Sequence, residues 1–149
     1  MALNDLVAAQ STAKQFTKNS RVLLLDYLAT HLNAKIRHYK FPMMLQIYSD
    51  ASYLSVPKAR SRAVGFYFLS NNFARPSQAK LNGAIRLLCK IIKIVVGLAF
   101  ESEITSAFLN THEAIPIRCT LEELDCKKTA TPTQVDNTTA AGFIHKQIK

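Results

Sequence analysis

Three acidic residues stand where clustered carboxylates could bind metal ions. Asp50 ends one predicted strand, Asp136 ends another, and Glu103 lies in the first turn of a predicted helix. If the two strands are parallel neighbours, Asp50 and Asp136 come close together, and the start of the helix brings Glu103 beside them. Clustered carboxylates repel one another unless cations neutralise them, and their hard oxygen atoms suit Mg²⁺. Two such ions about 3.5–4 Å apart activate water and stabilise the leaving oxygen in phosphodiester cleavage.

Each of these acids also fits an ordinary structural role. Asp136 could cap the helix that follows it, and Asp50 could mark a turn. Glu101 and Glu103 could favour the positive end of their helix. Glu101 is also the alternative helix acid for the site, and it would replace Glu103 if the helix began differently. The residues alone leave these interpretations open.

The elements that must position the acids follow from the hydrophobic pattern. Residues 45–50 alternate between two faces as a strand does, and residues 63–69 are rich in aromatic side chains. The apolar run that follows Gly83 predicts a third strand over residues 87–96, buried on much of its length. Residues 36–39 could form a further short strand. Three successive strands predict an antiparallel meander.

Helices and a fourth strand complete the predicted fold. Residues 100–115 have a helical pattern, Pro116 predicts a kink or break, and helix resumes through Leu124. A short strand over residues 134–136 precedes a last helix over 138–148. A fourth strand parallel to the first needs the long helix as its crossover. The expected fold class is therefore α/β, with a mixed sheet and flanking helices, preceded by a helix from about residue 20 to residue 32.

The charge distribution points to a polyanionic partner. The chain has 149 residues and a net charge of +9, and residues 51–100 contain eight Lys or Arg and no Asp or Glu. A basic stretch of this kind suits nucleic acid, with Lys58, Arg60 and Arg62 as the expected phosphate contacts. The alternative is a solvated basic surface without a partner.

The remaining composition favours an intracellular protein, cytoplasmic or nuclear, without a membrane segment. Three cysteines, Cys89, Cys119 and Cys126, are odd in number and form no CxxC motif, so we expect them to be reduced. No signal peptide is visible at the N-terminus. The longest apolar stretch, residues 91–100, is about half the length needed to span a bilayer.

The ordered set of motifs resembles the ribonuclease H-like region of copia-type retrotransposon reverse transcriptase polyproteins. The segments that carry the resemblance are residues 47–55 (IYSDASYLS), 58–63 (KARSRA), 99–104 (AFESEI), 113–118 (EAIPIR), 121–124 (LEEL) and 134–141 (QVDNTTAA). In residues 3–35 the chain looks like the segment that joins the polymerase part to this domain. The set as a whole is specific, although each piece alone is weak.

The resemblance implies Mg²⁺-dependent hydrolysis of the RNA strand of an RNA–DNA hybrid. It implies that Asp50, Glu103 and Asp136 are the catalytic and metal-binding acids, and that the polymerase domain of the same polyprotein is a partner. It implies residues 1–40 as a connecting arm and helix, and residues 41–149 as a ribonuclease H-like domain that is incomplete at its C-terminus. The family's fourth carboxylate lies beyond Lys149, so the second of the two ions would lose a ligand.

The sequence therefore carries two functional hypotheses. The first is a metal-dependent ribonuclease acting on hybrid duplex, whose substrate is read by shape and 2′-hydroxyls. The second is a catalytically inactive retrotransposon remnant that at most binds nucleic acid through the same basic stretch. A further departure from the family pattern is Phe100, which places bulk where a small residue is usual. Metal-dependent cleavage separates the two hypotheses, because both predict salt-sensitive binding.

Overall fold

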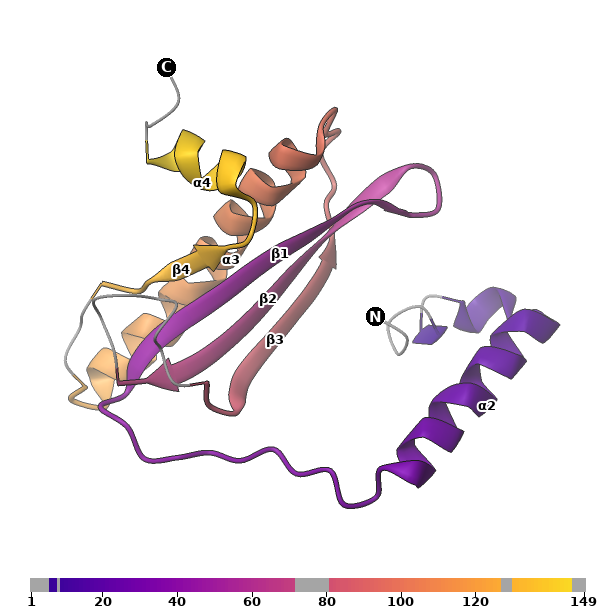
Figure 1. Cartoon of the computed structure of the whole chain (residues 1–149), viewed down its shortest axis with the longest axis horizontal. Helices are drawn as coiled ribbons and strands as arrows, with labels where there is room; N and C mark the ends of the chain where they lie inside the picture. Colours follow the sequence, from indigo (N-terminus) through magenta and orange to yellow (C-terminus); the bar gives the residue numbers. More distant parts are fainter. Residues whose placement is uncertain (1–5, 8, 72–80, 127–129, 146–149) are drawn as a thin grey trace. The chain divides into compact units, whose positions relative to one another are not determined.

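The structure is a computed structural model that describes residues 6–7, 9–71, 81–126 and 130–145 (Figure 1). The chain divides into two compact units, Met1–Ile36 and Arg37–Lys149. Most of the loop predicted after Asn71 lies outside the described residues, as does the end of the last predicted helix.

The first unit contains the 3-10 turn η1 (Gln10–Thr12) and helix α2 (Gln15–Thr30). Helix α2 begins five residues before the predicted Ser20, because the Lys14 backbone N–H donates to Thr17 Oγ1 and closes the first turn at that point. No helix in the described part of the chain is long and apolar enough to cross a membrane.

A four-stranded mixed sheet forms the centre of the second unit. Its strands are β1 (Met44–Val56), β2 (Arg60–Ser70), β3 (Ala84–Ile91) and β4 (Thr133–Val135), in the order β3-β2-β1-β4. The β1–β2 and β2–β3 pairs are antiparallel, and β4 is parallel to β1. The predicted meander with a parallel fourth strand is therefore confirmed. The short strand predicted over residues 36–39 is wrong, because this stretch is irregular and the Tyr39 N–H bonds to the Asn82 side chain instead.

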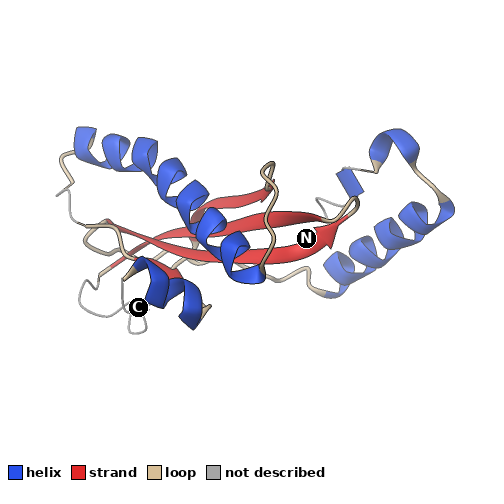
Figure 2. Cartoon of the chain, turned by 90° about the horizontal axis from the view of Figure 1, so that it is seen from above, coloured by secondary structure: helices blue, strands red, loops and turns tan. Residues whose placement is uncertain are grey.

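Helix α3 (Ala99–Glu123) is the connection between β3 and β4 and packs across β1 and β2 (Figure 2). Of the kink or break predicted at Pro116, the break is wrong, because α3 continues through this residue. A proline inside a helix costs about 3 kcal/mol, but α3 is packed on both sides of it. Ala114 belongs to the buried core, and Ile117 and Leu121 pack against that core.

The third strand differs from the prediction in its bounds and its burial. Strand β3 ends at Ile91, and most of its side chains are at least partly exposed. At the C-terminal end of β3, Ile91 pairs with Arg62, which lies near the start of β2. Beyond this pair, the Ile92 N–H donates to Ser61 O at 2.9 Å. Because β2 begins at Arg60, only two residues before Arg62, no β2 backbone lies opposite the apolar run that follows Ile92. This run forms a loop in which Val95 is 99% exposed.

The short helix α4 (Thr138–Ile144) follows β4 and contacts α3. Its N-terminal cap is Asn137, whose side-chain oxygen accepts a hydrogen bond from the Ala140 N–H at 3.0 Å. The buried side chains between the sheet and α3 form the core. The principal members of this core are Leu45, Ile47, Tyr67, Leu88 and Ala114.

Candidate metal centre

The structure brings the three predicted acids together. Each of Asp50, Glu103 and Asp136 offers a carboxylate oxygen, and these oxygen atoms all lie within 4.8 Å of one another. Among the described residues, this is the one group of three or more His, Cys, Asp or Glu side chains arranged to hold a metal ion. The separation is short enough for a single cation to reach all three.

Parallel pairing of β1 and β4 explains why the two aspartates meet. Ile47 pairs with Thr133, Tyr48 with Gln134 and Ser49 with Val135. Continuing this register by one residue sets Asp50 opposite Asp136. Helix α3 supplies the third acid, although Glu103 lies just past the first turn of the helix and not within it as predicted. The Glu103 carboxylate accepts a hydrogen bond from the Ala51 N–H at 3.3 Å, which holds it beside β1.

Glu103 is the buried member of the cluster. It is 7% exposed, whereas Asp50 and Asp136 are exposed. Its Oε2 atom is buried and has no hydrogen-bond partner among the described residues. Burial raises the pKa of Glu103 to about 7, and repulsion from Asp136 and then Asp50 adds to the rise. A buried oxygen without a donor, facing two other carboxylates, lacks the positive charge that a bound cation would supply.

Capping of α4 and stabilisation of the start of α3 are carried out by residues outside the cluster. Asn137, not Asp136, caps α4. Glu101 lies outside the cluster, and its Oε2 accepts hydrogen bonds from the Gly97 N–H at 2.7 Å and the Leu98 N–H at 3.2 Å. It therefore stabilises the start of α3. Of the two helix acids, the geometry places Glu103 in the cluster.

The donor set fits a hard divalent cation. The three carboxylates could hold one metal ion, and carboxylate oxygen atoms are the ligands that Mg²⁺ and Ca²⁺ take in proteins. Thiolate and imidazole ligands, which favour zinc, do not take part in the cluster.

We expect the stability of the metal-free protein to fall as pH rises from about 4.5 to about 7, because of Glu103. The folded protein holds the Glu103 proton up to about pH 7, whereas the unfolded chain releases it near its ordinary pKa of about 4.3. The folded state thus binds more protons across this window, and stability decreases with pH. The thermal midpoint of wild type minus that of Glu103→Gln, measured in a chelator, isolates this contribution. A difference that stays constant between pH 4.5 and 7 would contradict the prediction.

The predicted basic residues lie on the β1–β2 hairpin. Lys58 and Ala59 form its turn with left-handed backbone angles (φ 66° and 52°). Lys58 and Arg60 are exposed, whereas Arg62 is 5% exposed within β2. Because pairing with β3 ends at Arg62, the hairpin extends beyond the end of β3 (Figure 1). Asp50 and the turn thus lie on the same pair of strands.

Two buried residues that bond to β1 next to Asp50 were not identified from the sequence. Ser106 and Asn110 are fully buried polar residues of α3 that face Ser49 of β1. Together with Glu103 they follow a helical i, i+3, i+7 spacing, which puts them on one face of the helix. That spacing was the available signal, because polar residues on the buried face of a helix require partners.

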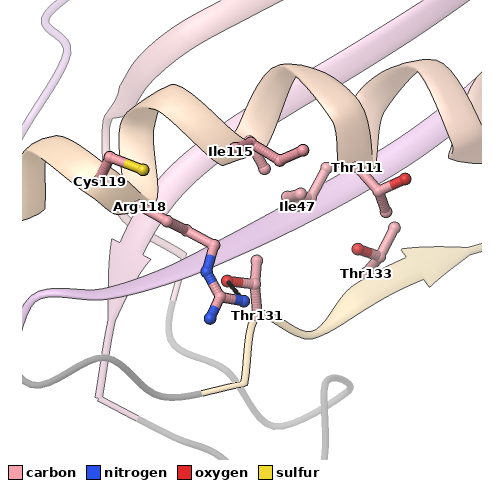
Figure 3. Close-up of a pocket in the computed structure, with 8 residues that line it drawn as sticks. Ile47, Thr111, Ile115, Arg118, Cys119, Thr131 and Thr133 are labelled. Carbon is pink, nitrogen blue, oxygen red and sulfur yellow. Dashed lines mark hydrogen bonds between the residues drawn. The ribbon is translucent and has the colours of Figure 1, made fainter. Parts of the chain in front are cut away.

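A separate cavity of about 290 Å³ lies further along α3, beside β4 (Figure 3). Its lining includes Ile47, Ile115 and Cys119, together with Arg118, whose Nη1 donates to Thr131 Oγ1 at 3.2 Å. None of the three clustered acids lines it. The cavity is therefore distinct from the candidate metal centre.

The site can be set beside known proteins. No family model, no curated protein and no solved structure matches this chain.

Proposed function

We propose that this chain is a metal-dependent ribonuclease H-like domain that hydrolyses the RNA strand of RNA–DNA hybrids, of the kind found in copia-type retrotransposon polyproteins. The observation that carries the proposal is the convergence of Asp50, Glu103 and Asp136 within 4.8 Å. These acids come from two parallel strands and the start of the crossing helix, and the buried one has an unpartnered oxygen.

Mg²⁺ is the proposed cofactor, and the three carboxylates would hold it. When bound between carboxylates, it supplies an activated water and stabilises the leaving oxygen of a phosphodiester. The protein's own contribution is to hold three carboxyl groups within reach of one cation. Glu103 is kept in place by the Ala51 N–H, and the exposed carboxylates of Asp50 and Asp136 leave the site accessible to a phosphate backbone.

Substrate binding is assigned to the β1–β2 hairpin. Arg60 pairs with Val56, six residues beyond Asp50, which corresponds to about 20 Å along an extended strand. Lys58 and Arg60 would therefore contact backbone phosphates away from the cleaved bond. The choice of RNA–DNA hybrid as substrate, and of the polymerase domain of the same polyprotein as partner, comes from the resemblance.

Cleavage of a labelled duplex tests the proposed activity. The substrate is an RNA–DNA hybrid labelled on its RNA strand, with double-stranded DNA, double-stranded RNA and single-stranded RNA as comparisons. We expect Mg²⁺-dependent cleavage of the hybrid RNA that stops in a chelator. Salt-sensitive binding of the hybrid without cleavage in either Mg²⁺ or Mn²⁺ would instead support an inactive nucleic-acid-binding remnant.

Single substitutions in the hairpin are expected to weaken hybrid binding and reduce its salt dependence. Each phosphate contact contributes about 0.9 to the slope of log affinity against log salt on B-form duplex. Lys58→Ala and Arg60→Ala should each lower the slope by roughly this amount. Arg118→Ala is the matched control, because its guanidinium bonds to Thr131 beside the separate cavity. Equal slopes for wild type and both hairpin variants would remove the hairpin from the interface.

A further inference from the structure

A buried polar network lies between α3 and the central strands, next to the backbone of Asp50. Its members are Ser49 of β1, Tyr67 of β2, and Ser106 and Asn110 of α3, and all four are buried. Polar groups in a core require hydrogen bonds, since an unsatisfied one costs about 1–3 kcal/mol. The network is therefore a specific arrangement between the helix and the two central strands.

The hydrogen bonds of this network run in one direction. The Tyr67 hydroxyl donates to Asn110 Oδ1 at 2.8 Å, and Asn110 Nδ2 donates to Ser49 Oγ at 2.9 Å. The Ser49 hydroxyl donates to Ser106 Oγ at 3.3 Å. The second N–H of the Asn110 amide donates to Val64 O at 2.8 Å, so every polar atom of that side chain has a partner. Burial raises the pKa of Tyr67 to about 12, which keeps its hydroxyl protonated and donating.

The network ends on the backbone of a clustered acid. The Ser106 hydroxyl donates to the backbone carbonyl of Asp50 at 2.6 Å. Ser106 lies three residues after Glu103, on the same face of α3. One side chain thus ties the strand residue that carries one carboxylate to the helix that carries another.

Strand β2 leaves room for this arrangement at a single glycine. A Cβ atom on Gly65 would lie 2.1 Å from Asn110 Oδ1 and 2.9 Å from Tyr67 Cε2. Such distances are shorter than any van der Waals contact. The missing side chain of Gly65 therefore allows Asn110 to reach across to Ser49.

We propose that Ser106 and Asn110 are positioning residues that hold Asp50 and Glu103 at the separation needed to share a metal ion. The inference rests on the proposed function in assigning these carboxylates to a metal. Groups that orient metal ligands typically change metal affinity by about 10–100-fold when they are mutated. Such an effect can be measured apart from folding.

The test compares Ser106→Ala with Ser102→Ala. Ser102 is an equally buried serine one turn earlier in α3, but its hydroxyl donates to Ala99 O within its own helix. Mn²⁺ affinity is measured by calorimetry on the full chain, and the thermal midpoint is measured without metal. We expect Ser106→Ala to weaken Mn²⁺ binding by about ten-fold or more, while Ser102→Ala binds as wild type does.

A second readout does not depend on metal. The Ala51 N–H donates to Glu103 Oε1, so its amide resonance and hydrogen exchange report the contact between β1 and the acid of α3. Ser106→Ala should shift this resonance and reduce its protection, and Ser102→Ala should not. If Ser106→Ala folds poorly, Tyr67→Phe serves as the second variant. It removes only the hydroxyl that donates to Asn110 Oδ1, and it should produce a smaller change of the same kind.

The outcomes separate the inference from the proposed function. A wild-type chain that binds no Mn²⁺ contradicts the metal site, and the Ala51 amide then decides the positioning role alone. A wild-type chain that binds Mn²⁺, with Ser106→Ala unchanged in affinity and in the Ala51 amide, overturns the positioning role and leaves the metal site standing. Equal losses in Ser106→Ala and Ser102→Ala also overturn it, because they indicate a general loosening of α3.

Discussion

Replacing Glu103 by Gln is expected to abolish hybrid cleavage while making the metal-free protein more stable above pH 7. The substitution removes the buried ligand of the cluster, so Mg²⁺-dependent cleavage should fall to the rate seen in a chelator. The substitution also removes a destabilising charge. Burial and repulsion from Asp136 and Asp50 raise the pKa of the Glu103 carboxyl group to about 7, so above that pH it carries a buried negative charge. Each kcal/mol gained raises the thermal midpoint of a domain of this size by about 4 °C. Cleavage assays and thermal unfolding at pH 8 measure the two effects.

Glu101→Gln is the matched control for this prediction. Glu101 lies two residues away on the same helix, but its carboxylate accepts hydrogen bonds from the Gly97 and Leu98 N–H groups. The carboxamide oxygen of Gln can still accept these hydrogen bonds, so cleavage should stay near the wild-type rate and stability should fall only by about 0.3–1 kcal/mol, the contribution of a negative charge at the start of a helix. If Glu101→Gln lost cleavage and Glu103→Gln retained it, the assignment of the helix acid would be reversed.

Gly65→Ala is expected to cost the domain much of its stability, although it adds only one methyl group. The new Cβ would lie 2.1 Å from Asn110 Oδ1, which has no room to retreat within its network. Overpacking a core costs about 1–3 kcal/mol, and breaking the Asn110 hydrogen bonds places the expected loss at the upper end. For a domain of this size, the thermal midpoint should drop by roughly 10 °C.

Two further variants make this prediction specific. Gly97→Ala adds the same methyl group where the nearest atom, Glu101 Oε2, lies at 3.6 Å, so its effect should be small. Combining Gly65→Ala with Asn110→Ala removes Asn110 Oδ1, the atom with which the new methyl group would clash. The double variant should therefore lose less stability than the sum of the two single variants. Additive losses would show that Gly65 and Asn110 are not in conflict.

The fold could be predicted from the sequence where local pattern and pairing agree. The alternation over residues 45–50 and the aromatic run of β2 mark two strands that pair over most of their length. The apolar run after β3 follows a strand pattern equally well, yet it forms a loop because β2 supplies no backbone opposite it. Pro116 likewise carries a local signal for a break, and packing of Ala114, Ile117 and Leu121 outweighs it.

The candidate site shows the same division. The cluster of Asp50, Glu103 and Asp136 could be predicted from the parallel pairing of two strands joined by a crossing helix. Two details of that prediction are wrong: β1 continues to Val56, so Asp50 lies within the strand and not at its end, and Glu103 lies just past the first turn of α3. The spacing of Ser106 and Asn110 indicates a polar buried face on α3, but their partner Ser49 could not be predicted, because it depends on how the helix packs against β1. The distinction between Glu101 and Glu103 also required the structure, because it depends on where α3 begins relative to Gly97.

The β1–β2 hairpin can change in length without any change in the cluster of carboxylates. A register irregularity between Ser52 and Val56, with Leu54 in a left-handed conformation (φ 49°), separates the regular pairing around Asp50 from the arm that carries Lys58 and Arg60. Each residue pair added beyond the irregularity lengthens the arm by about 3.3 Å and turns the side chains at its tip to the opposite face. If the hairpin binds a duplex as proposed, insertions and deletions beyond the irregularity would change the length of duplex that it contacts and leave the positions of the three carboxylates unchanged.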